Sequence, residues 1–246
     1  MICCVLAGGF ATRLYPLTID KPKALLEVRG QPLLEHLLND IHTIPDITRI
    51  LIVTNEKFFR TTNDWILMHH YSLPIEVINN GISRPEDSLG AVDSIVQVIR
   101  TCRLREDLMV LAADNLLDFS LKYFAEYQKM VGGSCVMWYF EEQLDNLRKT
   151  GVGHIENGKL VRMVEKPIAP LDKCAIPPFY IYSTDLFGSI VQSLEQGCRG
   201  DSPGHLLEWL VRKHEINAMK MPGLRYDIGD LHSYKMVKSM FDRKTC

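Results

Sequence analysis

The stretch from Leu6 to Lys23, LAGGFATRLYPLTIDKPK, combines bare backbone with two well-spaced cations. Gly8 and Gly9 lack side chains, so their N–H groups can approach a ligand closely. Arg13 can bind phosphate oxygens in pairs through its guanidinium, and Lys23 can act as a point charge. These residue types in this order indicate a site for a small anion. The alternative is a glycine turn flanked by surface cations.

Other glycine-rich anion sites do not fit this stretch. The dinucleotide fingerprint G-x-G-x-x-G is absent, because Ala11 and Leu14 occupy the later glycine positions when counting begins at Gly9. The P-loop pattern G-x-x-x-x-G-K-[ST] occurs nowhere in the chain. An oxidoreductase that binds a dinucleotide on a doubly wound sheet is therefore disfavoured.

Two carboxylates could complete such a site. Asp114 ends the apolar run VLAAD, and Asp227 lies beside a glycine in YDIGD. Hard oxygen ligands suit Mg²⁺, which keeps several waters and bridges phosphate groups. Each carboxylate could instead cap a helix or close a turn, and the sequence alone does not show that the two meet. Asp230 is interpreted as the N-cap of the last helix.

Apolar strands alternate with amphipathic helices through the first half of the chain, around these residues. The predicted strands cover 1–7, 49–54, 75–79, 107–114 and 134–140, and the predicted helices cover 31–44, 57–70, 88–102 and 120–130. This order favours an α/β fold with a doubly wound, mostly parallel sheet. Ligands bind at the carboxyl ends of the strands in that architecture.

Mixed structure is predicted after about residue 140. Residues 152–166 read as two short strands around an Asn157-Gly158 turn. Further strands are expected at 179–183 and 217–222, and helices at Asp185–Gln196, Pro203–Lys213 and Leu231–Phe241. No linker interrupts the pattern. We therefore expect one domain over 1–246 with two lobes, about 1–140 and about 141–246.

Charge, apolar runs and cysteine content limit which binding partners and which location are expected. Lys plus Arg number 28 and Asp plus Glu 30, and a net charge of −2 argues against nucleic acid or an anionic membrane as partner. No apolar run approaches the ~20 residues of a membrane span, and the first residues lack the basic start of a signal peptide. The seven cysteines include no CxxC pair, which indicates reduced thiols in a cytoplasmic protein.

The opening stretch resembles the signature of the sugar-1-phosphate nucleotidylyltransferases, also called NDP-sugar pyrophosphorylases. That signature is a Gly-Gly-x-Gly-Thr-Arg-Leu loop, then Pro, Thr and a lysine before an apolar strand. The matching positions are Gly8, Gly9, Thr12, Arg13, Leu14, Pro16, Thr18 and Lys23. Ala11 replaces the third glycine, a change that we expect to be tolerated if its φ is negative. VLAADN, TGVGHI, VEKP and RYDIGD resemble later elements of the family in the family's order.

The resemblance implies a reaction that joins a sugar 1-phosphate to an NTP and releases pyrophosphate, with Mg²⁺ as cofactor. It implies that Arg13 grips the β- and γ-phosphates, that Lys23 lies near the reacting α-phosphate, and that Asp114 and Asp227 hold the metal. The implied nucleotide-binding residues are Leu6, Ala7, Gly8, Gly9, Thr12, Gly90 and Asp114. The implied acceptor-binding residues are Asn115, Gly151, Glu165, Lys166 and Tyr180. The lobe 1–140 would then bind the nucleotide, and the lobe 141–246 the phosphorylated acceptor.

Two segments depart from the family pattern and leave the substrates open. Pro85 falls about where a polar residue reads the base, so thymidine or uridine is only a starting assumption. Pro178 replaces a glycine beside Tyr180, so glucose 1-phosphate is not assumed. A cytidylyltransferase for a phosphonate or phosphocholine-like acceptor, and a non-catalytic regulatory member of the fold, are the alternatives. Hexapeptide repeats are absent, so no fused acetyltransferase is expected. The oligomeric state is left open.

Overall fold

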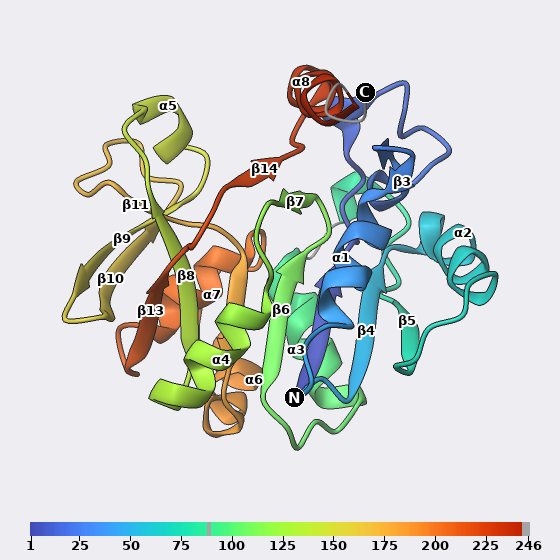
Figure 1. Ribbon diagram of the computed structural model, residues 1–246. Helices are drawn as coiled ribbons and strands as arrows, with labels where there is room; N and C mark the ends of the chain where they lie inside the picture. The colour runs from blue at the N-terminus through green and yellow to red at the C-terminus, as the bar shows by residue number, and fades with distance from the viewer. Residues whose placement is uncertain (88–89, 243–246) are drawn as a thin grey trace. The chain divides into compact units, whose positions relative to one another are not determined.

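The computed structural model describes residues 1–87 and 90–242, which form two compact units (Figure 1). The N-terminal unit consists of Cys3–Ser88, Ala112–Lys122 and Gly223–Cys246. The central unit consists of Met1–Ile2, Leu89–Leu111 and Tyr123–Pro222. Each unit takes segments from both halves of the chain, and the expected division into two lobes near residue 140 stays a prediction.

The N-terminal unit contains three neighbouring strands in the order β1, β4 and β5. They are β1 (Ile2–Leu6), β4 (Arg49–Thr54) and β5 (Ile75–Asn79), and β4 and β5 run parallel. The two helices between these strands are α1 (Leu33–Ile41) and α2 (Glu56–Leu67). Asn55 begins α2 by accepting a hydrogen bond from the backbone N–H of Phe58 at 3.0 Å, as an N-cap does. The strand–helix alternation predicted for this part of the chain is confirmed.

Two small antiparallel pairs complete the N-terminal unit. They are β2 (Glu27–Val28) with β3 (Gln31–Pro32), and β7 (Asn115–Leu117) with β14 (Arg225–Asp227). Two 3₁₀ turns, η1 (Thr12–Leu14) and η2 (Lys23–Leu25), lie in the loop after β1. A third, η3 (Pro85–Asp87), follows β5, and α8 (Leu231–Asp242) follows β14.

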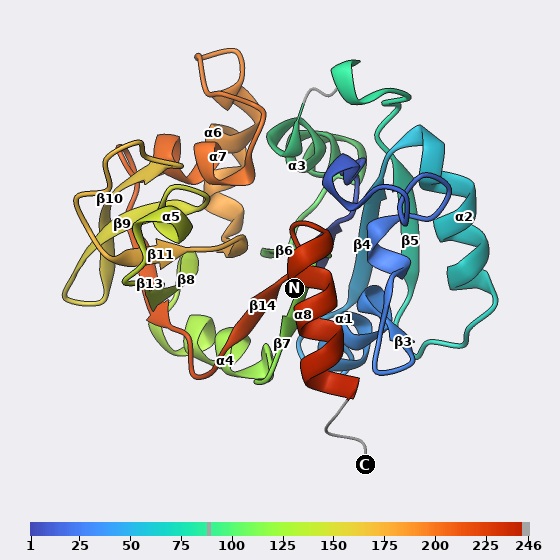
Figure 2. The same cartoon turned by 90° about the horizontal axis from the view of Figure 1, so that it is seen from above.

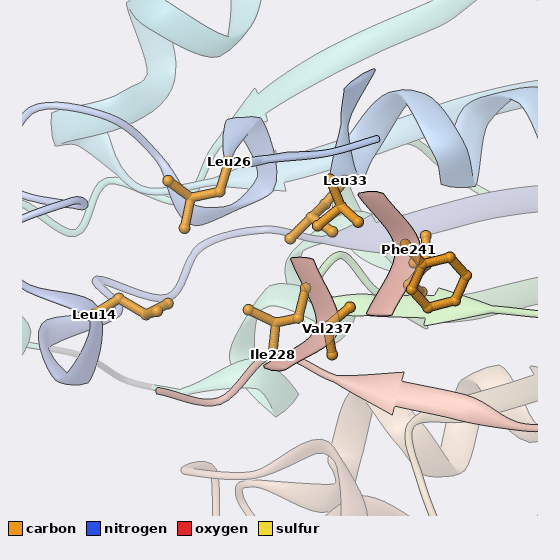
Figure 3. Packing of buried hydrophobic residues seen from close by; sticks show 8 residues of the cluster. Leu14, Leu26, Leu33, Ile228, Val237 and Phe241 are labelled. Atoms are coloured by element: carbon orange, nitrogen blue, oxygen red, sulfur yellow. The ribbon is translucent and has the colours of Figure 1, made fainter. Parts of the chain in front are cut away.

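A buried apolar cluster ties these short segments together (Figure 3). It joins the loop after β1 to α1, β7, β14 and α8, so that α8 lies beside α1 (Figure 2). Each buried side chain of this size contributes about 1.5–3 kcal/mol relative to exposure. The cluster therefore fixes the segments that follow β1, β6 and β14 against one another. Its members are Leu14, Leu26, Val28, Leu33, Leu116, Ile228, Val237 and Phe241.

The central unit contains strands in the order β11, β9, β10, β13, β8, β12 and β6. They are β6 (Leu108–Ala112), β8 (Cys135–Phe140), β9 (Gly151–Glu156), β10 (Lys159–Glu165), β11 (Cys174–Ile176), β12 (Phe179–Tyr182) and β13 (Ile216–Lys220). The helices are α3 (Ala91–Thr101), α4 (Lys122–Val131), α5 (Leu144–Leu147), α6 (Phe187–Ser193) and α7 (Pro203–Leu210), with the 3₁₀ turn η4 (Thr184–Leu186) before α6.

The α/β class is confirmed, and so is the mixed structure predicted after about residue 140. β13 pairs with β8 in parallel, whereas β9, β10, β11 and β12 form antiparallel pairs. Of these pairs, β9 and β10 are joined by a two-residue turn, which can connect only antiparallel neighbours. Asn157 and Gly158 both have positive φ, as the predicted tight turn between β9 and β10 requires.

The structure also bears on the state of the cysteines and on membrane-spanning helices. The six cysteines that the structure describes are all free thiols. Within residues 1–87 and 90–242, no helix is both long and apolar enough to cross a membrane.

His154 on β9 is held between two carboxylates and gives stability a pH dependence. Its Nδ1 lies 2.8 Å from Asp172 Oδ1, and its Nε2 lies 2.8 Å from Glu156 Oε1. The hydrogen bond with Asp172, and then that with Glu156, raises the pKa of His154 above its usual 6.5. A raised pKa in the folded state stabilises the fold at low pH, and the contribution is lost as pH rises through the folded-state pKa.

We therefore expect His154→Gln to lose stability relative to the parent at about pH 6 and to differ little at about pH 8.5. Urea unfolding at both pH values measures this difference. His232→Gln is the control, because His232 is exposed on α8. An equal loss at both pH values would show that the His154 bonds do not depend on its charge.

Candidate functional site

The glycine loop begins where three strands of the N-terminal unit end. Asn55, directly after β4, donates from Nδ2 to the Gly8 carbonyl at 3.0 Å. Asn80, directly after β5, lies so close that a methyl group on Gly8 would be 3.1 Å from its Nδ2. Gly9 is exposed, and a methyl group there would meet nothing within 4 Å. The loop therefore lies at the carboxyl ends of the strands, as predicted, and its backbone is open at Gly9.

Ala11 has a conformation that the sequence argument did not expect. Its φ is 51° and its ψ 42°, in the left-handed region, so the condition of a negative φ is not met. Alanine costs roughly 1–2 kcal/mol more in that region than in a right-handed one. The turn is held because the Ala11 carbonyl accepts bonds from the Leu14 N–H at 2.9 Å and from Thr18 Oγ1 at 2.8 Å. Thr18 thus stabilises the loop from a fully buried position.

The two cations of the loop have different surroundings. Arg13 is exposed in η1, and no ion-pair partner is found for it in the part of the chain that the structure describes. Lys23 is only 15% exposed, and its Nζ lies 2.8 Å from Asp114 Oδ2. Lys21 instead lies 3.2 Å from Glu27 at the surface. The structure thus places Lys23, and not Lys21, at the carboxylate.

The β7–β14 pair brings Asp227 to Asp114. Asp227 lies opposite Asn115 in the strand register, and the Ile228 N–H donates to the Asp114 carbonyl at 3.0 Å. Asn115 donates to Asp114 Oδ1 at 2.8 Å and accepts a bond from Arg225. The two aspartates, distant in the sequence, are therefore neighbours within one unit.

The charges of this group act strongly on one another. Burial tends to raise the pKa of Asp114, but the charge and hydrogen bond of Lys23, aided by Arg225, lower it below its usual range. Partial burial and the negative charge of Asp114 raise the pKa of Asp227. A divalent cation would relieve the repulsion between the two carboxylates.

The residues present fit Mg²⁺. Asp227 is 50% exposed, and both aspartates offer the hard oxygens that this ion prefers. Among the described residues no cluster of three or more His, Cys, Asp or Glu could hold a metal. Magnesium sites of this kind use one or two carboxylates and complete their coordination with water and substrate phosphates. Asp114 and Asp227 would therefore hold the ion together with a phosphate-bearing ligand.

Asp230 and Arg225 show what local patterns can and cannot reveal. Asp230 Oδ1 accepts from the Ser233 N–H at 2.8 Å, so the predicted N-cap of α8 is confirmed.

Arg225 was missed by the sequence analysis. It lies two positions before Asp227 on β14, and such spacing places both side chains on one face of a strand.

Most of the expected acceptor-binding residues lie in the central unit. Gly151 is opposite Glu165 in the β9–β10 register, and a methyl group on Gly151 would be 3.0 Å from Glu165 Oε2. Lys166 is exposed, with Nζ 3.8 Å from Glu165 Oε1 and a φ of 49°. Tyr180 is only 1% exposed and contacts the ring of Tyr182, which favours a packing role over direct contact with an acceptor. Asn115 belongs instead to the carboxylate group described above.

Gly90, also in the central unit, has a structural reason to be glycine. Its φ is 98°, and a methyl group there would collide with the Gly200 carbonyl. That carbonyl accepts a bond from the Val92 N–H at 3.1 Å, at the start of α3. Packing therefore demands glycine at this position, and contact of Gly90 with a nucleotide stays a prediction.

An α/β fold with an open glycine loop, an exposed arginine and a carboxylate pair at strand ends is an arrangement suited to a phosphate-rich ligand. The sequence model of the nucleotidyl transferase family matches residues 2–243, nearly the whole chain. The chain belongs to the nucleotidyl transferase family, and the predicted resemblance is confirmed.

Two curated relatives and a solved structure agree with this assignment. The UTP–glucose-1-phosphate uridylyltransferase AglF of Haloferax volcanii is 26% identical over 233 residues, 93% of this chain and 91% of the relative. A Sulfolobus acidocaldarius protein, provisionally named a mannose-1-phosphate guanyltransferase, is 29% identical over 187 residues, 76% of this chain and 49% of the relative. The chain thus spans about half the length of that relative. A UDP-glucose pyrophosphorylase solved with UDP-glucose has a TM-score of 0.82 and 21% identity over 99% of this chain and 98% of that one, which shows the fold.

Proposed function

We propose that this protein is a Mg²⁺-dependent sugar-1-phosphate nucleotidylyltransferase, which converts an NTP and a sugar 1-phosphate into an NDP-sugar and pyrophosphate. The observation that carries the proposal is the group formed by Lys23, Asp114 and Asp227 in the same unit as the open glycine loop. Relatives named for uridylyl and guanylyl transfer to hexose 1-phosphates support it.

In the proposed reaction an oxygen of the sugar phosphate attacks the α-phosphorus, and pyrophosphate leaves in line. The attacking phosphate is already ionised at about pH 7, so the protein needs neither a nucleophilic side chain nor a general base. Its task is to bring two polyanions together and to stabilise the charge that develops. Mg²⁺ held by Asp114 and Asp227 would neutralise part of that developing negative charge.

The loop cations would divide the remaining work. Without ligand, Lys23 offsets the charge of Asp114, and its three N–H donors can also serve a phosphate oxygen near that carboxylate. Arg13 is exposed and can pair with the β- and γ-phosphates through two N–H groups. Gly9 leaves room for a phosphate against the backbone.

Arg13→Ala should impair both NTP binding and turnover. Hydrogen bonds to charged groups contribute about 1.5–3 kcal/mol, so we expect kcat/KM for the NTP to fall by roughly tenfold or more. Steady-state kinetics with varied NTP measures this effect. Arg29→Ala is a suitable control, because Arg29 is exposed beside α8. Unchanged NTP kinetics in Arg13→Ala would remove Arg13 from the phosphate site.

The acceptor and the base are tested by one screen. Each of the five common NTPs is combined with a panel of hexose 1-phosphates, phosphonates and phosphocholine, and pyrophosphate is measured. We expect release that requires both an NTP and a sugar 1-phosphate, and that stops with EDTA. Release only with CTP and a phosphonate or phosphocholine would favour the cytidylyltransferase alternative. No release from any pair would favour a regulatory role on the same fold.

A further inference from the structure

Residues at the start of α7 and further along it form hydrogen bonds with Glu165, the last residue of β10. Ser202, the residue before α7, donates from Oγ to Glu165 Oε1 at 2.6 Å. Glu208, further along α7, accepts a bond from the Glu165 backbone N–H at 3.1 Å. Both ends of this contact are buried, since the Glu165 side chain is 5% exposed and Ser202 is 6% exposed. The helix thus fixes both the backbone and the side chain of Glu165.

Two glycines shape the space around the other carboxylate oxygen. A methyl group on Gly204 would collide with Glu165 Oε2, and one on Gly151 would lie 3.0 Å from the same atom. The carboxylate cannot easily turn away from a side chain at position 204, because the Ser202 bond holds its first oxygen. Gly204 therefore leaves room for the carboxylate beside α7, whereas a side chain at position 151 would first meet Met163 Cε, at 2.0 Å.

The two carboxylate oxygens have unequal partners. Oε1 receives the Ser202 hydroxyl and lies 3.8 Å from Lys166 Nζ. Oε2 accepts no hydrogen bond in the part of the chain that the structure describes. An oxygen that is held in place and left without one is suited to accept a bond from a ligand.

Burial of the Glu165 carboxylate is unfavourable for its charged form. Burial raises the pKa of Glu165, the Ser202 hydrogen bond opposes this rise, and the charges of Lys166 and His205 oppose it further. Glu208 acts in the opposite direction and raises the pKa. Two apolar side chains could join β10 to α7 without this desolvation. Packing of β10 against α7 alone therefore does not explain why a carboxylate lies at this contact.

We propose that Ser202 and Gly204 are positioning residues that hold Glu165 in one orientation, so that its free oxygen accepts hydrogen bonds from hydroxyl groups of the acceptor. This inference rests on the proposed function, in which Glu165 contacts the sugar phosphate. If this inference is correct, residues at the start of α7 help to determine which acceptor binds. It also predicts that the acceptor carries hydroxyl groups that donate to Glu165. The affinity for acceptors that lack such hydroxyls should not depend on this contact.

The test compares Ser202→Ala with the hydroxyl-retaining Ser202→Thr. We expect Ser202→Ala to raise KM for the sugar phosphate about tenfold, within the range for a hydrogen bond to a charged group, and to leave KM for the NTP near that of the parent. Ser202→Thr should recover most of the loss. Ser193→Ala is the matched control, because Ser193 is also buried and donates at 2.8 Å to the Ile190 carbonyl, away from Glu165.

A second measurement needs no substrate. Carbon-13 NMR of labelled glutamate carboxyl groups follows the titration of Glu165, assigned by its loss in Glu165→Gln. Removal of a donor to the charged form should raise the pKa of Glu165 in Ser202→Ala and leave it unchanged in Ser193→Ala. A positioning role for the hydroxyl predicts this shift, whereas a purely packing role does not.

The outcomes separate this inference from the proposed function. If Glu165→Gln leaves KM for the sugar phosphate unchanged, Glu165 does not contact the acceptor, and both the role of Glu165 and this inference fall. If Glu165→Gln raises that KM but Ser202→Ala does not, the positioning role alone is overturned. A Ser202→Thr variant as impaired as Ser202→Ala would also overturn it, because the hydroxyl would then not be the group that matters.

Discussion

Replacing Lys23 with alanine should lower kcat by roughly 10²-fold or more while changing KM for either substrate much less. The structure places Lys23 Nζ 2.8 Å from Asp114 Oδ2, in a side chain that is largely shielded from solvent. A charge held there acts on the reacting phosphates mainly as negative charge develops in the transition state, and loss of such a contact lowers kcat. Steady-state kinetics at saturating Mg²⁺ measures the effect.

Lys21→Ala provides the matched control, because it removes the same kind of charge two positions away. Lys21 pairs with Glu27 at the surface, and such pairs contribute about 0–1 kcal/mol to stability. We expect Lys21→Ala to turn over almost normally and to melt close to the parent, whereas Lys23→Ala should melt at a lower temperature, because it leaves the Asp114 carboxylate without its partner. An inactive Lys21→Ala beside an active Lys23→Ala would show that the loop has been assigned in the wrong register.

Asp227→Asn should slow turnover by roughly 10²-fold or more and raise the concentration of Mg²⁺ needed for half-maximal rate. The amide keeps the shape of the side chain but removes the charge that faces Asp114. Asp227 is half exposed, so its loss should cost little stability. Activity measured over a Mg²⁺ titration, together with a thermal melt, separates the two effects.

Asp20→Asn is the control for this variant, because Asp20 is an exposed carboxylate in the same unit. It should match the parent in both rate and Mg²⁺ requirement. If Asp227→Asn reaches the parental rate at the parental Mg²⁺ concentration, the two-aspartate metal site is wrong.

Strong local patterns carried most of the fold prediction. The strands β1, β4 and β6 are buried on both faces, so they read as continuous apolar runs. The β9–β10 hairpin follows from Asn157-Gly158, since both residues must have positive φ in such a turn. The cap at Asp230 follows from a short carboxylate before an amphipathic helix.

Contacts between distant, short segments could not be predicted in the same way. The β7–β14 pair has three residues in each strand, too few for a periodic pattern, and yet it brings Asp227 to Asp114. Family resemblance, and not spacing, suggested that meeting. The left-handed Ala11 was also unexpected, because its conformation depends on the bonds that its carbonyl receives from the following turn and from Thr18. Ser202 gave no signal, because its role depends on where α7 packs.

The most direct test of the proposed reaction follows the oxygen atoms. A sugar 1-phosphate labelled with ¹⁸O on its phosphate is incubated with the NTP that gives pyrophosphate in the screen, and both products are analysed by mass spectrometry. Attack by the sugar phosphate on the α-phosphorus should place the full label in the NDP-sugar and none in the pyrophosphate. Loss of label from the NDP-sugar, or no NDP-sugar from any pair of substrates, would contradict the account.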